Sequence, residues 1–487
     1  MLLNSKFGYI LNGPIERPSP AFDDKRIQST NFCQNVILKQ SEVGDDIVSF
    51  SESKKWEDKI DRFWELDSLG ILPKEESIYD KFESDIKFVD NRYEVRLPFK
   101  ENHSLIEDNY ATSLIRLKSL KSKLEKTPEL MKAYNEVIQQ QIKDGIVEII
   151  SPDEKEPSPG EVTYLPHRAV LRKEKDTTST RVVYDASAKS RNGPSLNECL
   201  YKGPCLTPLI FDELMKFRMH KIAITADIEK AYLQISVFPP HRDFLRFLWF
   251  TDIEDDDLRI VKLRFLRVIF GATSSQYLLN AVIRKHINRY AKEDPVFVQK
   301  LLDALYVDDL TSGSDTVSEG IELYEKCKKR FSEGNFNLRK WRTNSKELKE
   351  KIREKEGLSP KNHGKVLGLI WDEENDHLIM NFSDIGKKYE REEVTKRSIL
   401  ATVAGFFDPL GLAQPIVVQL KILFQESCKL QLKWNETVSE ELSKKWTETI
   451  TAIRNLGNLI VPRCYCYTEV FNPIESIEIV GFSDASF

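Results

Sequence analysis

The spacing of apolar residues along the chain alternates between a pattern typical of strands and one typical of helices. Short apolar runs bounded by polar turns predict strands, and apolar residues recurring every three or four positions predict helices. The predicted strands cover residues 146–150, 162–185 with a turn at 173–180, 222–226, 244–250, 259–266 and 365–371. The predicted helices cover residues 111–143, 274–290, 317–331, 398–406, 414–430 and 440–455. The fold class that follows is α+β.

Two of the apolar runs end in acidic residues. Residues 306–310 read Tyr-Val-Asp-Asp-Leu, and the pattern predicts a strand, a tight turn carrying Asp308 and Asp309, and a second strand. The run 222–226 ends at Asp227. If these strands are neighbours, two metal ions about 3.5–4 Å apart could share Asp227 and Asp308 in a phosphoryl transfer. The alternative is a solvated Asp-Asp turn, because Asp favours turns for local hydrogen-bonding reasons.

Length and composition indicate a globular protein. The chain has 487 residues, of which 40% are hydrophobic and 31% charged, enough for about three domains. No apolar stretch approaches the roughly 18 residues needed to cross a bilayer, and the N-terminus lacks the pattern of a signal peptide. The seven cysteines are scattered, which predicts reduced thiols in an intracellular protein.

The net charge of −5 argues at first against a nucleic-acid enzyme. The charge is unevenly distributed, however. Residues 41–94 carry 16 acidic and 8 basic residues, whereas residues 164–192 carry 7 basic and 3 acidic ones, and residues 321–356 carry 12 basic and 7 acidic ones. Phosphate contacts could concentrate in the two basic segments. A solvated helix face explains the last segment almost as well.

Taken together, these motifs make the chain resemble a reverse transcriptase. Tyr-Val-Asp-Asp-Leu is one of that family's most specific signatures, and its partners lie in family order: Asp227 first, then Phe-Gly-Ala-Thr-Ser-Ser at 270–275, then Asp308 and Asp309. More narrowly, the chain is similar to the polymerase of a BEL/Pao-type long-terminal-repeat retrotransposon. The resemblance implies a right-hand polymerase with fingers, a palm built on an antiparallel sheet, and a helical thumb and connection.

The resemblance also implies a role for individual residues. Asp227 and Asp308 would hold two Mg²⁺ ions, for which Mn²⁺ could substitute, and Asp309 would support them less directly. The carbonyl oxygen of Ile228 would add a further ligand. Catalysis in such a site is mainly positioning and charge neutralisation.

Four further residues would bind substrate if the resemblance holds. Arg181, in the predicted fingers hairpin, would fork onto the incoming triphosphate. Tyr232 would be a steric gate against the ribose 2′-OH, and Phe270 and Gly271 would let the backbone approach the base pair. The alternatives are an exposed hairpin charge for Arg181 and an amphipathic tyrosine in a first helical turn for Tyr232.

The same resemblance divides the chain into five parts. Residues 1–14 resemble the end of an aspartic protease, although the chain contains no Asp-Thr-Gly or Asp-Ser-Gly. Residues 15–110 are a linker with an aromatic anchor at Phe63-Trp64. Residues 111–385 are fingers and palm, with residues 244–250 and 259–266 as a palm hairpin and 365–371 in the primer grip. Residues 386–470 are thumb and connection, a region also named Pao retrotransposon peptidase, for which the sequence offers no protease machinery. Residues 471–487 begin an RNase H domain with Asp484, and we expect no RNase H activity from that one carboxylate.

We therefore expect an RNA-directed DNA polymerase from a retrotransposon polyprotein truncated at both ends. Its partners would be an RNA or DNA template–primer duplex and deoxynucleoside triphosphates, with no membrane. Its location would be intracellular and cytoplasmic, in virus-like particles of an intact element. Template, primer and oligomeric state do not follow from the sequence. The alternatives are a silent remnant that at most binds nucleic acid, and an unrelated Mg²⁺-dependent enzyme.

Overall fold

The computed structural model describes residues 2–5, 8–11, 82–171, 180–251, 253, 259–357, 364–382 and 393–465. The chain forms two units, one of Met1–Leu72 with Asn472–Phe487 and one of Pro73–Phe471. In the first unit, β1 (Leu2–Ser5) and β2 (Gly8–Leu11) form an antiparallel hairpin. All other elements described below belong to the second unit.

The four-stranded sheet that carries the aspartates has the order β12-β13-β8-β14, and we call it the Asp227 sheet. Its strands are all antiparallel to their neighbours. They are β8 (Ile222–Ile228), β12 (Leu305–Tyr306), β13 (Asp309–Ser314) and β14 (Leu338–Thr343). The two short strands β12 and β13 form the predicted hairpin around residues 307–308.

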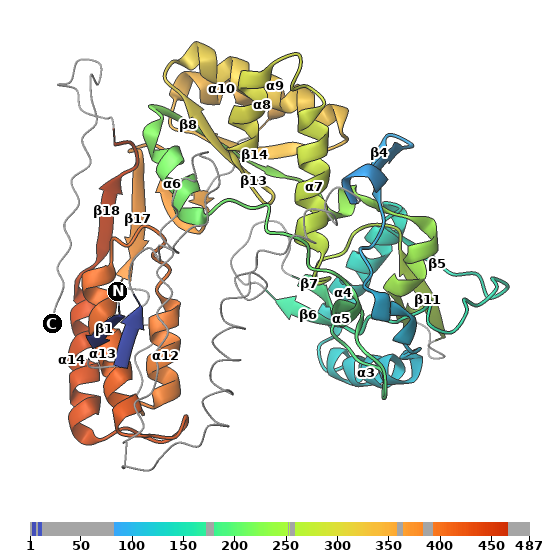
Figure 1. Ribbon diagram of the computed structural model, residues 1–487, viewed down its shortest axis with the longest axis horizontal. Helices are drawn as coiled ribbons and strands as arrows, with labels where there is room; N and C mark the ends of the chain where they lie inside the picture. The colour runs from blue at the N-terminus through green and yellow to red at the C-terminus, as the bar shows by residue number, and fades with distance from the viewer. Residues whose placement is uncertain are drawn as a thin grey trace, which may run out of the picture. The chain divides into compact units, whose positions relative to one another are not determined.

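The two faces of β8 have different surroundings because successive side chains of a strand point to opposite faces. Ile222, Ile224, Ala226 and Ile228 lie in the main hydrophobic core. The helix α9 (Val317–Glu333) packs on this face, and Figure 1 shows it beside β8, β13 and β14. Asp227 points the other way, and it lies on the face whose far end is covered by α6 (Ile210–Met219).

The strands expected to form a palm hairpin pair as predicted, and they lie in a sheet separate from the Asp227 sheet. β10 (Arg246–Phe250) and β11 (Ile260–Phe265) are antiparallel, and β11 pairs with β5 (Val147–Ile149). Every residue of β10 is buried, so this strand needs cover on both faces. In the Asp227 sheet, β14 already occupies the position beside β8.

Three more sheets complete the strand content of the described residues. β6 (His167–Leu171) pairs with β7 (Thr180–Tyr184), as the predicted fingers hairpin requires. β3 (Lys87–Val89), β4 (Arg92–Val95) and β9 (Ser236–Val237) form a second sheet. β15 (Gly364–Val366), β16 (Leu369–Asp372), β17 (His377–Asn381) and β18 (Asn458–Pro462) form a third, antiparallel throughout.

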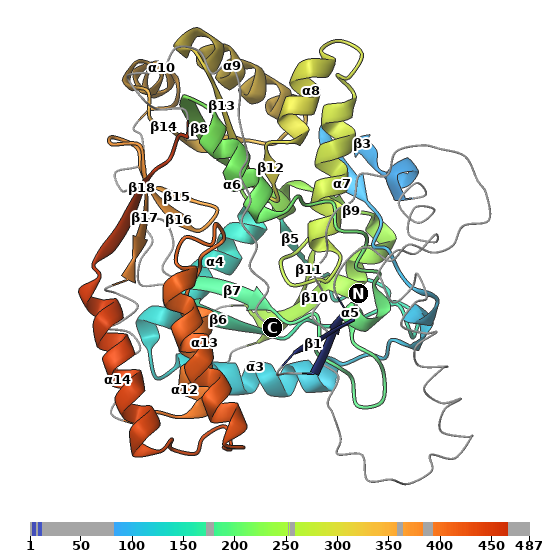
Figure 2. The ribbon, with the colours of Figure 1, turned by 60° about the vertical axis from the view of Figure 1, so that its left-hand side comes forward.

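The predicted helices are present with small changes at their ends. The stretch 111–143 is two helices, because Pro128 takes the first helical position after the N-cap Thr127. α12, α13 and α14 run side by side, as both views show (Figures 1 and 2). The remaining bounds are α3 (Tyr110–Leu124), α4 (Pro128–Lys143), α5 (Leu196–Cys199), α7 (Ser275–Asn288), α8 (Pro295–Leu302), α10 (Lys346–Glu356), α12 (Lys396–Gly405), α13 (Gln414–Lys429), α14 (Glu440–Asn455), and the 3-10 helices η2 (Glu101–Leu105), η3 (Ala231–Gln234) and η4 (Pro239–Leu245).

Some predictions lie outside the described residues. These are the anchor at Phe63-Trp64 and the strand carrying Asp484. Within the part of the chain that the structure describes, no helix has both the length and the apolar character to span a bilayer.

Candidate functional site

The β12–β13 hairpin brings all three aspartates to one end of the Asp227 sheet. Asp309 is the register partner of Asp227. The backbone N–H of Ile228 donates to the carbonyl oxygen of Asp308 at 2.8 Å. The strand pairing on which the sequence prediction depends is therefore present, and Asp308 stands at the turn beside the end of β8.

The turn that places Asp308 has a strained backbone. Val307 has a φ of +58°, in the left-handed region. A β-branched residue is an outlier there, and the conformation costs about 1–2 kcal/mol. Strain of this kind persists only where the surrounding structure imposes it, and it gathers at functional sites. Here the hydrogen bond between Ile228 and Asp308 and the pairing of β12 with β13 hold the turn.

Two basic side chains from β14 face the Asp227 carboxylate. The ammonium of Lys340 donates to Asp227 Oδ2 at 3.0 Å. The Arg339 Nε lies 3.6 Å from Asp227 Oδ1, too far for a hydrogen bond. Both of those atoms are buried, and neither has a hydrogen-bond partner among the described residues. Asp227 therefore holds an unused acceptor oxygen in a positively charged setting.

A neighbouring carboxylate fixes Arg339. The Arg339 Nη1 donates to Glu229 Oε1 at 2.8 Å, and the Asn337 amide donates to Glu229 Oε2 at 2.9 Å. Sequence reasoning missed Lys340, Arg339 and Glu229 as parts of the site. The signal available was the basic excess of residues 321–356, which was equally consistent with a solvated helix.

The donor set suits Mg²⁺ only if further oxygens come from outside the protein. Within the described residues, no three His, Cys, Asp or Glu side chains lie close enough together to hold a metal ion. Mg²⁺ commonly uses one or two carboxylates together with substrate phosphates and water. Asp227, with its unpartnered Oδ1, and Asp308 beside it fit that incomplete arrangement. Mn²⁺ prefers the same oxygen donors.

Tyr232 and Phe270 form an aromatic pair close to Asp308. Their ring centroids are 4.5 Å apart with an interplanar angle of 65°, an edge-to-face contact. Burial, and secondarily the charge of Asp308, raise the pKa of Tyr232 to about 12, so its hydroxyl stays protonated. Phe270 is 54% exposed. The residue proposed as a steric gate therefore lies beside one of the aspartates, with an open aromatic face next to it.

Gly271 lies against β7 and connects the site to the hairpin of Arg181. Gly271 has a φ of +101°, and a Cβ there would lie 2.8 Å from the carbonyl oxygen of Tyr184. Arg181 is on the same strand, about 10 Å further along at the usual rise of a strand. Its side chain is exposed. The structure thus explains the glycine by local packing, and the approach to a base pair stays a prediction.

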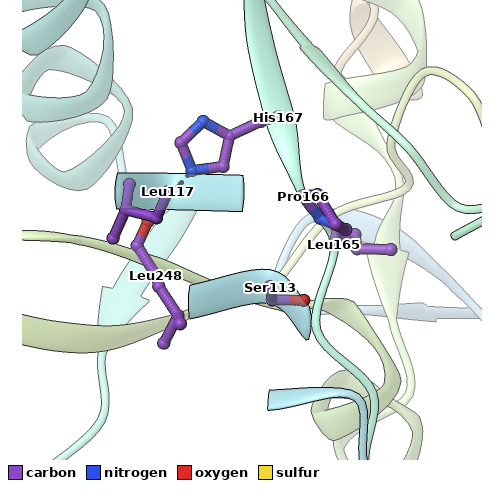
Figure 3. A pocket seen from close by; sticks show the side chains of 6 residues that line it. All are labelled: Ser113, Leu117, Leu165, Pro166, His167 and Leu248. Carbon is purple, nitrogen blue, oxygen red and sulfur yellow. Dashed lines mark hydrogen bonds between the residues drawn. The ribbon is translucent and has the colours of Figure 1, made fainter. Parts of the chain in front are cut away.

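A cavity behind the β6–β7 hairpin is too small to bind substrate. It is lined by Ser113, Leu117, Leu165, Pro166, His167 and Leu248 (Figure 3). Its volume of about 10 Å³ is at the lower limit for one water molecule. The His167 Nε2–H donates to the Leu248 carbonyl, so Nδ1 accepts from the Tyr134 hydroxyl. The cavity is a packing detail, and the open end of the Asp227 sheet remains the candidate site.

Comparison with protein-family models finds a match in the C-terminal part of the chain. Residues 395–487 match the model of the Pao retrotransposon-like RNaseH-like domain. No curated protein gives a match. The matched region includes α12, α13, α14 and β18, which the sequence analysis assigns to the thumb and connection. The match indicates an RNaseH-like domain at the C-terminus of a mixed α/β chain. The match supports a protein derived from a Pao/BEL retrotransposon and suggests an enzyme family that acts on nucleic acids.

Proposed function

We propose that the chain is an RNA-directed DNA polymerase of a Pao-type retroelement, with the fingers, palm and thumb of a right-hand polymerase. The observation that supports this most is the pairing of β8 with the β12–β13 hairpin, which sets Asp227 opposite Asp309 and next to Asp308. A merely solvated Asp-Asp turn would not require a strained valine at its tip. The reaction transfers a deoxynucleotide to a primer 3′-OH on an RNA or DNA template and releases pyrophosphate.

In this proposal each residue has a positioning or electrostatic task. Two Mg²⁺ ions held by Asp227 and Asp308, with Asp309 and the Ile228 carbonyl in support, would neutralise charge on the transferring phosphoryl group. Tyr232 limits the space at the sugar, and its protonated hydroxyl adds no charge beside Asp308. Arg181 binds the triphosphate. Alignment of the primer 3′-OH with the α-phosphate supplies most of the remaining rate enhancement.

The family match favours a second candidate, a nuclease that cleaves RNA–DNA hybrids. Asp484, the carboxylate expected in that domain, lies outside the described residues. We place the polymerase activity in the Asp227 sheet because the aspartates are brought together there. Degradation of a labelled RNA–DNA hybrid would test the second candidate separately.

Primer extension on poly(rA)–oligo(dT) with Mg²⁺ tests the proposal. The parent chain should extend the primer, and Asp308→Asn should not, because the change keeps size but removes the ligand charge. Asp315→Asn is the control, since Asp315 follows the far end of β13 and is exposed. Extension by all three chains would show that the site is misplaced. If none extends the primer although each is folded and binds the duplex, the chain is a silent remnant.

A further inference from the structure

The contact between Lys340 and Asp227 depends on an irregularity in β14. The pairing of β14 with β8 shifts its register between Arg339 and Arg342. Within this bulge Lys340 has a φ of +53°, a conformation that lysine rarely adopts. Bulges re-aim side chains next to functional sites. Here the bulge brings the Lys340 ammonium to 3.0 Å from Asp227 Oδ2.

The lysine stands where a cation would bind the carboxylate. A metal ion at Asp227 would bring a charge of +2 next to Lys340 and next to Arg339, whose Nε is 3.6 Å from Asp227 Oδ1. Arg339 is fixed by Glu229 at 2.8 Å, so it cannot move away without losing that pair. Lys340 has no second acid partner among the described residues, and its side chain is 43% exposed. Of the two bases, Lys340 is the one free to leave.

We propose that Lys340 competes with the divalent cation for Asp227, so that the protein binds the metal weakly alone and tightly together with a triphosphate. This inference rests on the proposed function. A triphosphate carries several negative charges and offers oxygens both to the metal and to the displaced ammonium. Lysine suits this exchange because it is a compact charge on a flexible four-carbon stem. The outcome is a coupling between metal and nucleotide, which is reciprocal by linkage.

The charges of Lys340 and of the carboxylates give a reason for this coupling. A site with two bare carboxylates would hold a metal ion before any nucleotide arrived. With Lys340 on Asp227, that carboxylate is already paired with a cation, and the metal enters with the nucleotide that needs it. Replacing Lys340 by methionine keeps an unbranched side chain of similar length but removes the competing charge. The variant should therefore bind the metal more tightly when no nucleotide is present.

Titration with Mn²⁺ alone, followed by electron paramagnetic resonance, measures this directly without a catalytic readout. We expect Lys340→Met to bind Mn²⁺ about tenfold more tightly than the parent, with Lys340→Arg restoring weak binding. Tenfold is a coupling within the usual range of such linkages. The control is Lys326→Met, because Lys326 pairs with Asp294 at 2.8 Å and has a similar exposure of 42% on α9. It should bind like the parent.

Two outcomes would overturn the inference, and they differ in what they say about the metal site. Equal affinity in the parent and Lys340→Met, with binding abolished by Asp227→Asn, would overturn the competition but leave the proposed metal site intact. If Asp227→Asn abolishes none of the observed Mn²⁺ binding, or no Mn²⁺ binds, both the competition and the proposed metal site are overturned. A second titration with dTTP present completes the cycle, and the gain in Mn²⁺ affinity caused by dTTP should be smaller in Lys340→Met than in the parent.

Discussion

Arg463 lies at the end of β18, inside the region that matches the RNaseH-like domain, and it is fully buried. Its guanidinium donates two hydrogen bonds to the Asp376 carboxylate, from Nε to Oδ1 at 2.6 Å and from Nη2 to Oδ2 at 2.7 Å. It also donates to the carbonyl oxygens of Phe217, His220 and Lys221, at 2.8, 2.7 and 3.1 Å. The Phe217 carbonyl belongs to the last turn of α6, and those of His220 and Lys221 belong to the two residues that join α6 to the strand of Asp227. One side chain therefore ties the C-terminal region to the strand of the proposed site.

Replacing Arg463 by methionine should be strongly destabilising. The variant keeps the apolar stem but leaves Asp376 without its cation and removes the Arg463 donor from three carbonyl groups, of which only that of Lys221 keeps another side-chain donor among the described residues, the Asn344 amide at 3.0 Å. Removing one partner of a buried ion pair costs about 3–5 kcal/mol. The exposed pair of Arg116 and Asp185 provides the comparison, with a distance of 2.7 Å and side chains 49% and 45% exposed. Arg116→Met should cost at most about 1 kcal/mol.

Urea denaturation followed by tryptophan fluorescence measures both variants. Trp371 is buried, and its indole N–H donates to Asp376 at 3.0 Å, so it reports on this network. With a slope of about 1–3 kcal/mol per molar urea, the midpoint of the first transition should fall by more than about 1 M in Arg463→Met. A shift no larger than that of Arg116→Met, at unchanged slope, would refute the reasoning that burial makes the Arg463 pair structurally essential.

Three more changes test separate features. Tyr232→Ala should raise ribonucleotide incorporation relative to deoxynucleotide by about tenfold or more, since pocket contacts of this size discriminate by roughly 1–3 kcal/mol, and unchanged discrimination would exclude the steric gate. Gly271→Ala should lower the free energy of unfolding by roughly 2–5 kcal/mol, because backbone strain at positive φ adds to the 2.8 Å approach of the new Cβ to the Tyr184 carbonyl oxygen. Gly145→Ala has the backbone strain but open space around it, so it should cost only about 1–2 kcal/mol. Burial lowers the pKa of His167 to about 4 from 6.5, so the unfolded chain binds a proton between these values that the folded chain does not. The contribution of His167 to the free energy of unfolding is therefore fully present above pH 6.5 and is lost as the pH falls toward 4, by about 2 kcal/mol between pH 7 and pH 5. A His167→Gln variant whose free energy of unfolding falls equally steeply over that range would contradict this.

Local patterns predicted most elements because they depend on neighbouring residues. The apolar run 222–226 and the turn at Asp308 needed only strand and turn signals, and the described strands have those positions. The sequence did not predict the sheet to which 244–250 belongs. An apolar run indicates a buried strand but does not indicate the strand with which it pairs. The partner of β11 is β5, which lies about a hundred residues earlier in the chain.

The part of the site that sequence reasoning missed depends on tertiary geometry. Lys340 reaches Asp227 only because β14 bulges, and nothing local in Phe336–Trp341 specifies a register shift. Arg339 is oriented by Glu229, which is 110 residues away in the chain. The strained φ of Val307 likewise follows from closing a two-strand hairpin next to β8 and has no signature in residue type. These features arise where packing overrides local preference.

In the proposed polymerase, Asp227 and Asp308 are the principal metal ligands and Asp309 is secondary, although Asp309 is the register partner of Asp227. The most direct test is the rate of single-nucleotide incorporation into a labelled primer by Asp227→Asn, Asp308→Asn and Asp309→Asn. We expect the rate to fall at least about 10²–10³-fold in the first two variants, the scale on which losing one electrostatic group slows catalysis, and clearly less in Asp309→Asn. Retained activity in Asp308→Asn together with loss in Asp309→Asn would contradict it.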